Sequence, residues 1–196
     1  MNRLDFFRES MRNLKTVGTV TRSSPALCKG MIKPIDFQKA KVVVELGAGD
    51  GVVTKHILKA LRPDAKLLVF EVNAQFCNKI REIKDDRMIV IEDSAENIEN
   101  HLHKLGLQQV DHIISAIPFV SLPVELCYSI VRTCKKILPQ KGLFVQIHYS
   151  LVMKKVYKSV FGNIDVRFVP LNFPPAFVLV CEKRQELNGN GNGKAH

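Results

Sequence analysis

The stretch Val43-Val44-Glu45-Leu46-Gly47-Ala48-Gly49-Asp50-Gly51 places a short apolar run directly before a glycine-rich turn. The run predicts a buried strand, and the pattern after it predicts that the turn opens a helix. Glycines at Gly47, Gly49 and Gly51 let backbone N–H groups approach a ligand. Their G-x-G-x-G spacing differs from the G-x-G-x-x-G of dinucleotide sites, and Glu45 precedes them within the strand. The turn therefore favours a cationic ligand over a pyrophosphate.

Outward from this turn, apolar runs alternate with helical patterns, which is typical of βαβ units and of a parallel sheet covered on both faces. Strands are expected at residues 42–46, 67–72, 88–91, 112–117 and 143–148. Helices are expected at residues 53–61, 73–83, 95–105, 123–138 and 151–161. Residues 166–170 and 176–182 are expected to form a hairpin across a turn rich in Pro and Asn. The pattern predicts an α/β fold that ends in a C-terminal β-hairpin.

Polar side chains follow two further strands where each strand ends. Glu71 stands at the end of the second predicted strand, at a distance from the glycine turn that suits an acid accepting both hydroxyls of a ribose. Asp93 and Ser94 follow the third strand, where polar groups can meet the edge of an adenine ring. Ligands of open α/β sheets bind at the carboxyl ends of the strands. The glycine turn, Glu71 and Asp93 therefore predict one nucleoside-binding edge.

Length and composition bound the remaining possibilities. A chain of 196 residues, 46% hydrophobic and 24% charged, is typical of one globular domain and excludes disorder for its bulk. Its five cysteines are widely spaced and never form C-x-x-C, so neither a disulfide framework nor a metal site is indicated. Because no signal-peptide core or long apolar span is present, we expect a cytoplasmic protein, peripheral on the inner face of the cell membrane.

The first 33 residues carry +5 of the net charge of +10, which favours anionic partners. Within them Leu4, Phe7, Met11 and Leu14 form one helical stripe, and a basic stripe of Arg8, Arg12 and Lys15 runs beside it. This is the pattern of an interfacial amphipathic helix, although packing of the apolar stripe on the domain explains it as well. We therefore divide the chain into a basic helical segment at 1–33, a main domain at 34–187 and a disordered tail at 188–196.

Together these motifs resemble the class I S-adenosylmethionine-dependent methyltransferases. Residues 45–51 resemble the first motif of that class, Glu71 the second and Asp93 the third. The resemblance implies a Rossmann-like, seven-stranded sheet with S-adenosyl-L-methionine as cofactor. It implies cofactor contacts from Glu45, Gly47, Gly49, Gly51, Glu71, Asp93, Ser94, Ser115 and Gly18, the last in a lid over residues 18–24.

A narrower resemblance involves residues 6–24, 115–119, 144–149 and 171–176, which are similar to small bacterial phospholipid N-methyltransferases. It implies that the amine of phosphatidylethanolamine is methylated toward phosphatidylcholine. It also implies that the basic N-terminal helix rests on an anionic membrane surface. An ornithine lipid is an alternative acceptor.

The competing resemblance is to rRNA adenine dimethyltransferases, which makes RNA the second candidate partner. Their fourth motif is of the Asn-Leu-Pro-Tyr type, and its counterpart here is Ala116-Ile117-Pro118-Phe119. In that family the Asn carbonyl accepts a hydrogen bond from the adenine amine, and Ala116 has no acceptor to offer. The chain is also too short for the additional basic domain that such enzymes carry.

Three residues are candidates for contact with the acceptor: Tyr149, Phe119 and Ser115. Methylation makes an amine permanently cationic, and an aromatic face stabilises such an ion by about 0.5–2 kcal/mol. Tyr149, just past the fifth strand, is the first choice for this face, and Phe119 is the second. His148 is a candidate proton acceptor. His101 and His103 lack the spacing of metal ligands on a helix, so we interpret both as surface residues.

Overall fold

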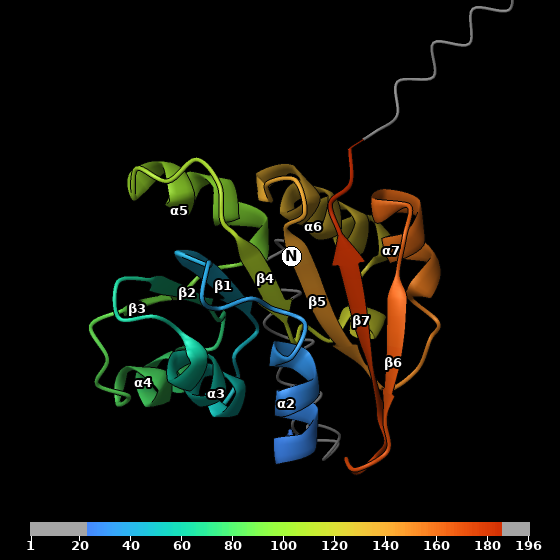
Figure 1. Ribbon diagram of the computed structural model, residues 1–196, viewed down its shortest axis with the longest axis horizontal. Coiled ribbons are helices and arrows are strands. Elements are labelled where there is room, and N and C mark those ends of the chain that lie inside the picture. Colours follow the sequence, from blue (N-terminus) through green and yellow to red (C-terminus); the bar gives the residue numbers. More distant parts are fainter. Residues whose placement is uncertain (1–22, 186–196) are drawn as a thin grey trace, which may run out of the picture.

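The computed structural model describes residues 23–185, which form a seven-stranded sheet with helices on both faces (Figure 1). The strand order is β3-β2-β1-β4-β5-β7-β6. The strands are β1 (Val42–Leu46), β2 (Lys66–Phe70), β3 (Met88–Ile91), β4 (His112–Ser115), β5 (Leu143–His148), β6 (Asp165–Val169) and β7 (Ala176–Glu182). Strands β1 to β5 are parallel, whereas β7 pairs antiparallel with both β5 and β6. The predicted fold class and the C-terminal hairpin are confirmed.

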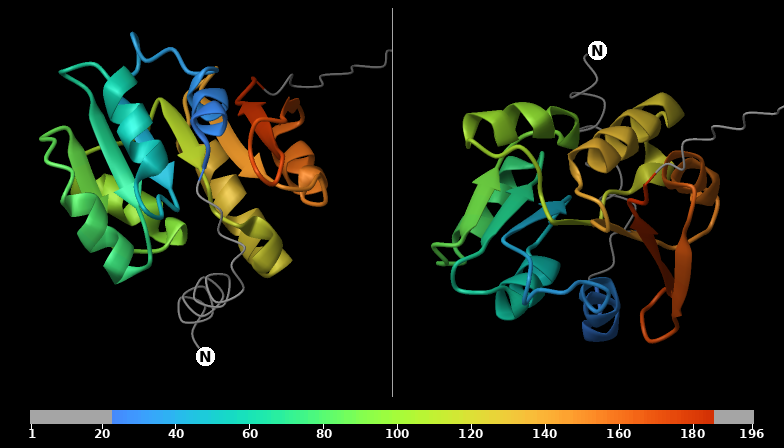
Figure 2. Two further views of the ribbon diagram at one scale, coloured as in Figure 1. Left: turned by 90° about the horizontal axis from the view of Figure 1, so that it is seen from below. Right: turned by 45° about the horizontal axis from the view of Figure 1, so that its top comes forward.

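Helices cover the sheet in two layers, each with its own apolar core (Figure 2). One layer holds α2 (Pro25–Ile32), α3 (Val52–Ala60) and α4 (Ala74–Arg81). The other holds α5 (Ile98–Lys104), α6 (Val124–Ile137) and α7 (Lys154–Phe161), with the short 3-10 helices η1 (Ala95–Asn97) and η2 (Phe119–Ser121). Alternate residues of the central strands face opposite layers, which explains why these strands are apolar along their whole length.

Helix α2 packs on the sheet although it lies within the predicted N-terminal segment. Ser24 caps it by accepting a hydrogen bond from the Leu27 amide, and Leu27 and Met31 are fully buried. The amphipathic stripe at residues 4–15, Gly18 and the tail at 188–196 lie outside the described residues. Within residues 23–185, no helix is long and apolar enough to cross a membrane.

Two predicted strands extend beyond β2 and β4 as the structure has them, and the end of β1 explains why. Strand β1 ends at Leu46 because Gly47 turns the chain with a φ of +71°. Its neighbours β2 and β4 end at Phe70 and Ser115, the residues paired with Leu46. The predicted extensions to residues 72 and 117 are therefore wrong, since no strand lies alongside them.

The resulting carboxyl edge is the one where β1 to β5 end. The chain leaves β1 toward β2 on one side, and β4 flanks β1 on the other. This reversal of strand order creates a crevice in which open α/β folds bind ligands. The glycine turn lies directly at this position.

Candidate cofactor and acceptor site

The glycine turn joins β1 to α3 and leaves space for a ligand. Gly47, Gly49 and Gly51 all have positive φ, at +71°, +56° and +79°. A Cβ at Gly47 would lie 3.2 Å from the Ile117 amide nitrogen, so both this close contact and the positive φ disfavour a side chain there. A Cβ at Gly49 would meet nothing within 4 Å. Gly49 therefore faces open space. Gly51 is the N-cap residue of α3, and no side-chain hydrogen bond caps this end of the helix.

Glu71 connects this turn to the next loop. The two carboxylate oxygens accept hydrogen bonds from the Gly49 and Asn73 amides, both at 2.9 Å. The side chain is buried, so these contacts fix its position beside the turn. Because a carboxylate oxygen can accept two hydrogen bonds, this arrangement is compatible with ribose hydroxyls as further donors.

Asp93 and Ser94 follow β3 and are held by the start of the next helix. One Asp93 oxygen accepts from the Ser94 amide at 2.7 Å and from Asn97 Nδ2 at 2.9 Å. The other lies 2.8 Å from His101 Nε2. Burial raises the pKa of Asp93, but hydrogen bonds from His101 and Asn97 outweigh it and hold that pKa below its usual value. Ser94 caps η1 through its hydroxyl.

His101 is the residue of this edge that sequence reasoning missed. Its ring contacts the Phe70 ring edge-on, with centroids 5.5 Å apart, and it is only partly exposed. His103 is exposed, as predicted, but the interpretation of His101 as a surface residue is wrong. Its contact with Asp93 depends on the packing of α5 against the end of β2, which spacing within one helix does not show.

Glu45 carries the clearest electrostatic signature in the site. It is 1% exposed, and one oxygen accepts a hydrogen bond from the Thr54 hydroxyl at 2.6 Å. The other oxygen has no hydrogen-bond partner among the described residues. Burial, with a smaller contribution from the charge of Glu71, raises the pKa of Glu45 to about 8 despite the Thr54 hydrogen bond. A buried carboxylate oxygen without a hydrogen-bond donor destabilises the folded protein, and a cationic group beside this Glu45 oxygen would offset that destabilisation.

On the opposite side of the crevice, Ser115 and Gln146 hold the loop that follows β4. Gln146 Nε2 donates to the carbonyl oxygens of Ile117 and Ile147 at 3.0 and 2.7 Å. Its Oε1 is buried without a partner among the described residues. Ser115 is fully buried in register with Gln146, and its hydroxyl accepts from the Ile117 amide at 3.4 Å. Both side chains therefore determine the path of residues 116–118.

The two aromatic candidates have different surroundings. Phe119 is fully buried, with its ring edge-on to Tyr157 at a centroid distance of 5.8 Å. Tyr149 is 42% exposed, and its hydroxyl is hydrogen-bonded to the Asn172 side chain. Burial raises the pKa of Tyr149, so its hydroxyl is protonated at neutral pH. Of these two rings, Tyr149 is the one within reach of a ligand that arrives from solvent.

His148 directly precedes Tyr149 and is held in place. Its Nε2 is 2.8 Å from the Tyr157 hydroxyl, and burial lowers the pKa of His148 to about 4. A group with so low a pKa is a poor acceptor for the proton of an alkylammonium. Burial and the contact with the Tyr157 hydroxyl therefore argue against the predicted role of His148 as a base.

A family model describing the methyltransferase small domain matches residues 17–169, which is more than half of the chain. The chain belongs to the methyltransferase small domain family. Ornithine lipid N-methyltransferase from Singulisphaera acidiphila is 31% identical over 184 residues, covering 92% of this chain and 96% of that protein. Ribosomal RNA small subunit methyltransferase H from Christiangramia forsetii is 28% identical over only 46% of this chain and 30% of its own. Human methyltransferase-like protein 13, solved in complex with SAH, has a TM-score of 0.63 at 18% identity, covering 82% of this chain and 83% of that one.

These findings confirm the predicted class of S-adenosylmethionine-dependent methyltransferase. The site of this methyltransferase fits the cofactor on two independent observations. Gly49 leaves open space at the start of α3, and the unpartnered Glu45 oxygen suits the cationic end of the cofactor. Within the described residues, no group of His, Cys, Asp or Glu side chains could hold a metal ion.

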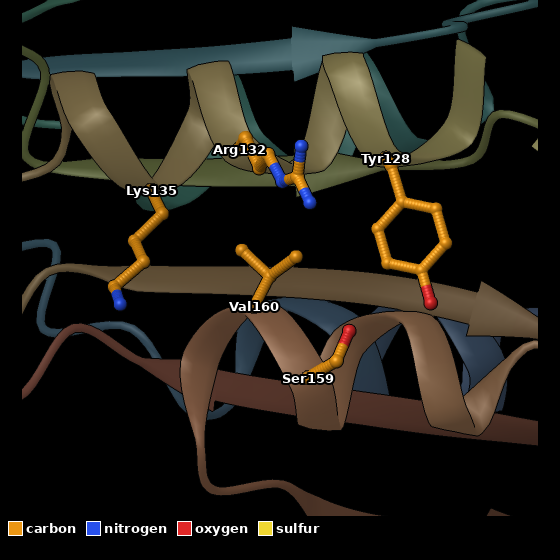
Figure 3. Close-up of a pocket in the computed structure, with 5 residues that line it drawn as sticks. All are labelled: Tyr128, Arg132, Lys135, Ser159 and Val160. Atoms are coloured by element: carbon orange, nitrogen blue, oxygen red, sulfur yellow. The ribbon is translucent and has the colours of Figure 1, made fainter. Parts of the chain in front are cut away.

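A separate hollow of about 430 Å³ lies between α6 and α7 (Figure 3). Tyr128, Arg132, Lys135, Ser159 and Val160 line it, and the Arg132 guanidinium lies 5.4 Å from the centre of the Tyr128 ring. None of the strand-end residues of the methyltransferase contributes to it. The hollow is therefore distinct from the cofactor crevice.

Proposed function

We propose that the protein transfers methyl groups from S-adenosylmethionine to the primary amine of a membrane lipid headgroup, with an ornithine lipid as the favoured acceptor. The observation that carries this proposal is the relationship to ornithine lipid N-methyltransferase, because it extends over nearly the whole of both chains. The similarity to the RNA enzyme covers less than half of the chain. Phosphatidylethanolamine, the acceptor implied by the sequence motifs, is the competing lipid.

In this proposal each strand end holds one part of the cofactor. Glu71 accepts hydrogen bonds from the ribose hydroxyls, and the amides of the glycine turn approach the amino-acid end. Glu45 loses its proton when the cofactor binds and then balances the positive charge of that end. Asp93 and Ser94 meet the adenine edge, with His101 fixing the Asp93 carboxylate. When bound, the cofactor supplies a methyl group activated by a sulfonium, so the chain mainly has to position the acceptor and exclude water.

The acceptor amine must lose a proton before it attacks. An alkylammonium has a reference pKa near 10.4, and transfer from water to a site beside a sulfonium lowers that value. Since the pKa of His148 is about 4, we assign the proton to solvent rather than to a side-chain base. Tyr149 then faces the increasingly methylated, permanently cationic nitrogen.

This role predicts that Tyr149→Ala slows the later methyl transfers more than the first, while Tyr149→Phe retains the ring and most of the rate. A lost aromatic contact of about 0.5–2 kcal/mol corresponds to roughly a two- to thirtyfold slower rate. The measurement is the ratio of singly to fully methylated product over time. An unchanged ratio in Tyr149→Ala would remove this residue from the acceptor site.

Attachment to the membrane is proposed for the basic N-terminal helix, which lies outside the described residues. Each basic side chain near an anionic surface contributes about 1 kcal/mol. Reversing Arg8, Arg12 and Lys15 to Glu should therefore release the protein from anionic vesicles while cofactor binding survives. Loss of cofactor binding in that variant would show that this segment serves the site instead.

The function is tested by supplying purified protein and labelled S-adenosylmethionine with three acceptors in parallel: ornithine lipid, phosphatidylethanolamine and total RNA. The proposal expects label in the ornithine lipid, and much less label with Glu71→Ala at a limiting concentration of S-adenosylmethionine. Label confined to phosphatidylethanolamine would change the acceptor but keep the reaction class. Label confined to RNA would refute the proposal.

A further inference from the structure

Exposed apolar side chains are concentrated at the carboxyl edge of the sheet. Among the described residues, nine large hydrophobic side chains are substantially exposed, and seven of them lie in loops or helix starts after strand ends at this edge: Val120, Val124, Tyr149, Leu151, Val152, Leu171 and Phe173. The most exposed are Phe173 at 85%, Leu171 at 78% and Val152 at 77%. Single exposed apolar residues are ordinary, but a gathering on one edge marks an interaction surface.

We call Leu151, Val152, Leu171 and Phe173 the apolar rim. They come from two loops that lie side by side, because the end of β5 pairs with the start of β7 through His148 and Phe177. The hydrogen bond between Tyr149 and Asn172 joins the same two loops. The rim therefore borders the acceptor side of the crevice.

The loop that carries Leu171 and Phe173 is held in one conformation. Asn172 Oδ1 accepts from the Ser24 amide at 3.0 Å, and its Nδ2 donates to the Pro174 carbonyl oxygen at 2.7 Å. The Ser24 hydroxyl donates to the Leu171 carbonyl oxygen at 2.8 Å. Asn172 is buried while its two neighbours project outward, so their exposure is built into the fold. The loop meets the start of α2 at the lower edge of the molecule in Figure 1.

The two segments that carry the rim have charges of one sign. Exposed Lys154, Lys155 and Lys158 follow Val152 directly on α7. Residues 149–158 and 168–176 contain no Asp or Glu. The apolar side chains of the rim suit the acyl boundary of a bilayer, and the lysines beside them suit its anionic headgroups.

We infer that the apolar rim enters the headgroup region of an anionic bilayer and holds the acceptor side of the crevice against the membrane. This inference rests on the proposed lipid substrate and goes beyond it, since it assigns a second membrane contact besides the N-terminal helix. A headgroup amine then reaches the site without the lipid leaving the bilayer. The lysines of α7 lie against the anionic headgroups around the inserted side chains.

The chain has no tryptophan, so Phe173→Trp introduces a single fluorescent reporter at the rim. The full-length variant is mixed with vesicles of phosphatidylcholine and phosphatidylglycerol, with and without bromine on the acyl chains. We expect a blue shift with the vesicles and loss of at least half of the emission with brominated lipid. Leu105→Trp is the matched control, because Leu105 is also exposed but lies at the far end of α5. It should show neither change.

Three results would overturn the inference. The first is protein that sediments with vesicles while Phe173→Trp is unquenched, which would leave attachment to the N-terminal helix alone. The second is a blue shift without lipid that grows with protein concentration, which would identify a second copy of the chain as the occupant. The third is a lipid-independent blue shift that disappears when residues 1–22 are deleted, which would show that this segment covers the rim.

A double variant, Leu171→Ser with Phe173→Ser, tests the energetic contribution without a reporter. Vesicle partitioning should weaken at least tenfold, while the affinity for S-adenosylmethionine is unchanged. Unchanged partitioning would contradict the inference. Quenching at Phe173→Trp without methylation of any lipid would refute the proposed function and leave the membrane contact standing, so the two failures are distinguishable.

Discussion

Replacing Glu45 by Gln removes the ionisable group whose pKa the fold raises most clearly within the site. The folded state raises this pKa from 4.5 to about 8, because the side chain is buried and, to a smaller extent, because the charge of Glu71 is near. Between these two pH values the unfolded chain has an ionised Glu45, whereas the folded chain keeps it protonated. The folded state therefore binds one more proton, and its stability falls as pH rises through this window.

The magnitude follows from proton linkage. One proton corresponds to about 1.4 kcal/mol for each pH unit, or about 4 kcal/mol between pH 5 and pH 8. This loss is absent below pH 4.5 and complete once the pH exceeds the folded pKa. Glu45→Gln has no such loss, so its stability relative to the unchanged protein should increase steadily over the same range.

The assay is chemical denaturation followed by circular dichroism at intervals from pH 5 to pH 9 in the absence of cofactor. The difference between the two stability curves cancels the other titrating groups. Glu125→Gln, an exposed carboxylate on α6, is the matched control and should follow the unchanged protein. Parallel curves for Glu45→Gln would refute the argument that Glu45 is protonated in the folded state.

Three further predictions concern the cofactor crevice. Glu71→Ala should weaken S-adenosylmethionine binding tenfold or more in titration calorimetry, because the carboxylate would no longer accept hydrogen bonds from the two ribose hydroxyls. Unchanged affinity would remove Glu71 from the ribose site. Gly49→Val should fold with reduced stability, because a φ of +56° strains a valine although nothing lies within 4 Å of a Cβ there. Cofactor binding should be lost, and normal binding by a folded variant would contradict the assignment of the open space. His101→Ala removes a hydrogen bond that keeps the pKa of Asp93 low. The ionised Asp93 therefore stabilises the folded state above its ordinary pKa of 3.8, and this stabilisation is lost as pH falls. The variant should unfold at a higher pH on acid titration, and an identical acid transition would exclude the contact.

The sheet and its ligand edge were predictable from sequence because their signals are local. Apolar runs in the sequence identified every strand. The glycines before α3 predicted a turn, and in the structure all three have positive φ. The positions of Glu71 and Asp93 at this edge were predictable, because the carboxyl ends of neighbouring parallel strands lie at one edge of the sheet. Strand ends were less predictable, since β2 and β4 end where their partner β1 turns away.

The parts that escaped prediction depend on contacts between distant segments. Phe119 follows a strand end like the other candidates, but packing of α6 and α7 buries it completely. His101 meets Asp93 only because α5 folds back over β2 and β3. The predicted helix at 151–161 begins instead at Lys154, and Leu151 and Val152, which precede it, are exposed. No periodicity in the sequence distinguishes an apolar residue that a helix buries from one that the fold leaves exposed.

The central claim, transfer of methyl groups to a lipid headgroup nitrogen, is tested most directly by mass spectrometry of the product. The full-length protein is incubated with ornithine lipid in anionic vesicles and with S-adenosylmethionine that carries a deuterated methyl group. Lipid masses should increase by whole numbers of labelled methyl groups, with the label in the headgroup fragment and much less of it when Glu71 is replaced by Ala at limiting S-adenosylmethionine. Unlabelled lipid in a reaction where the same protein labels RNA would contradict this claim.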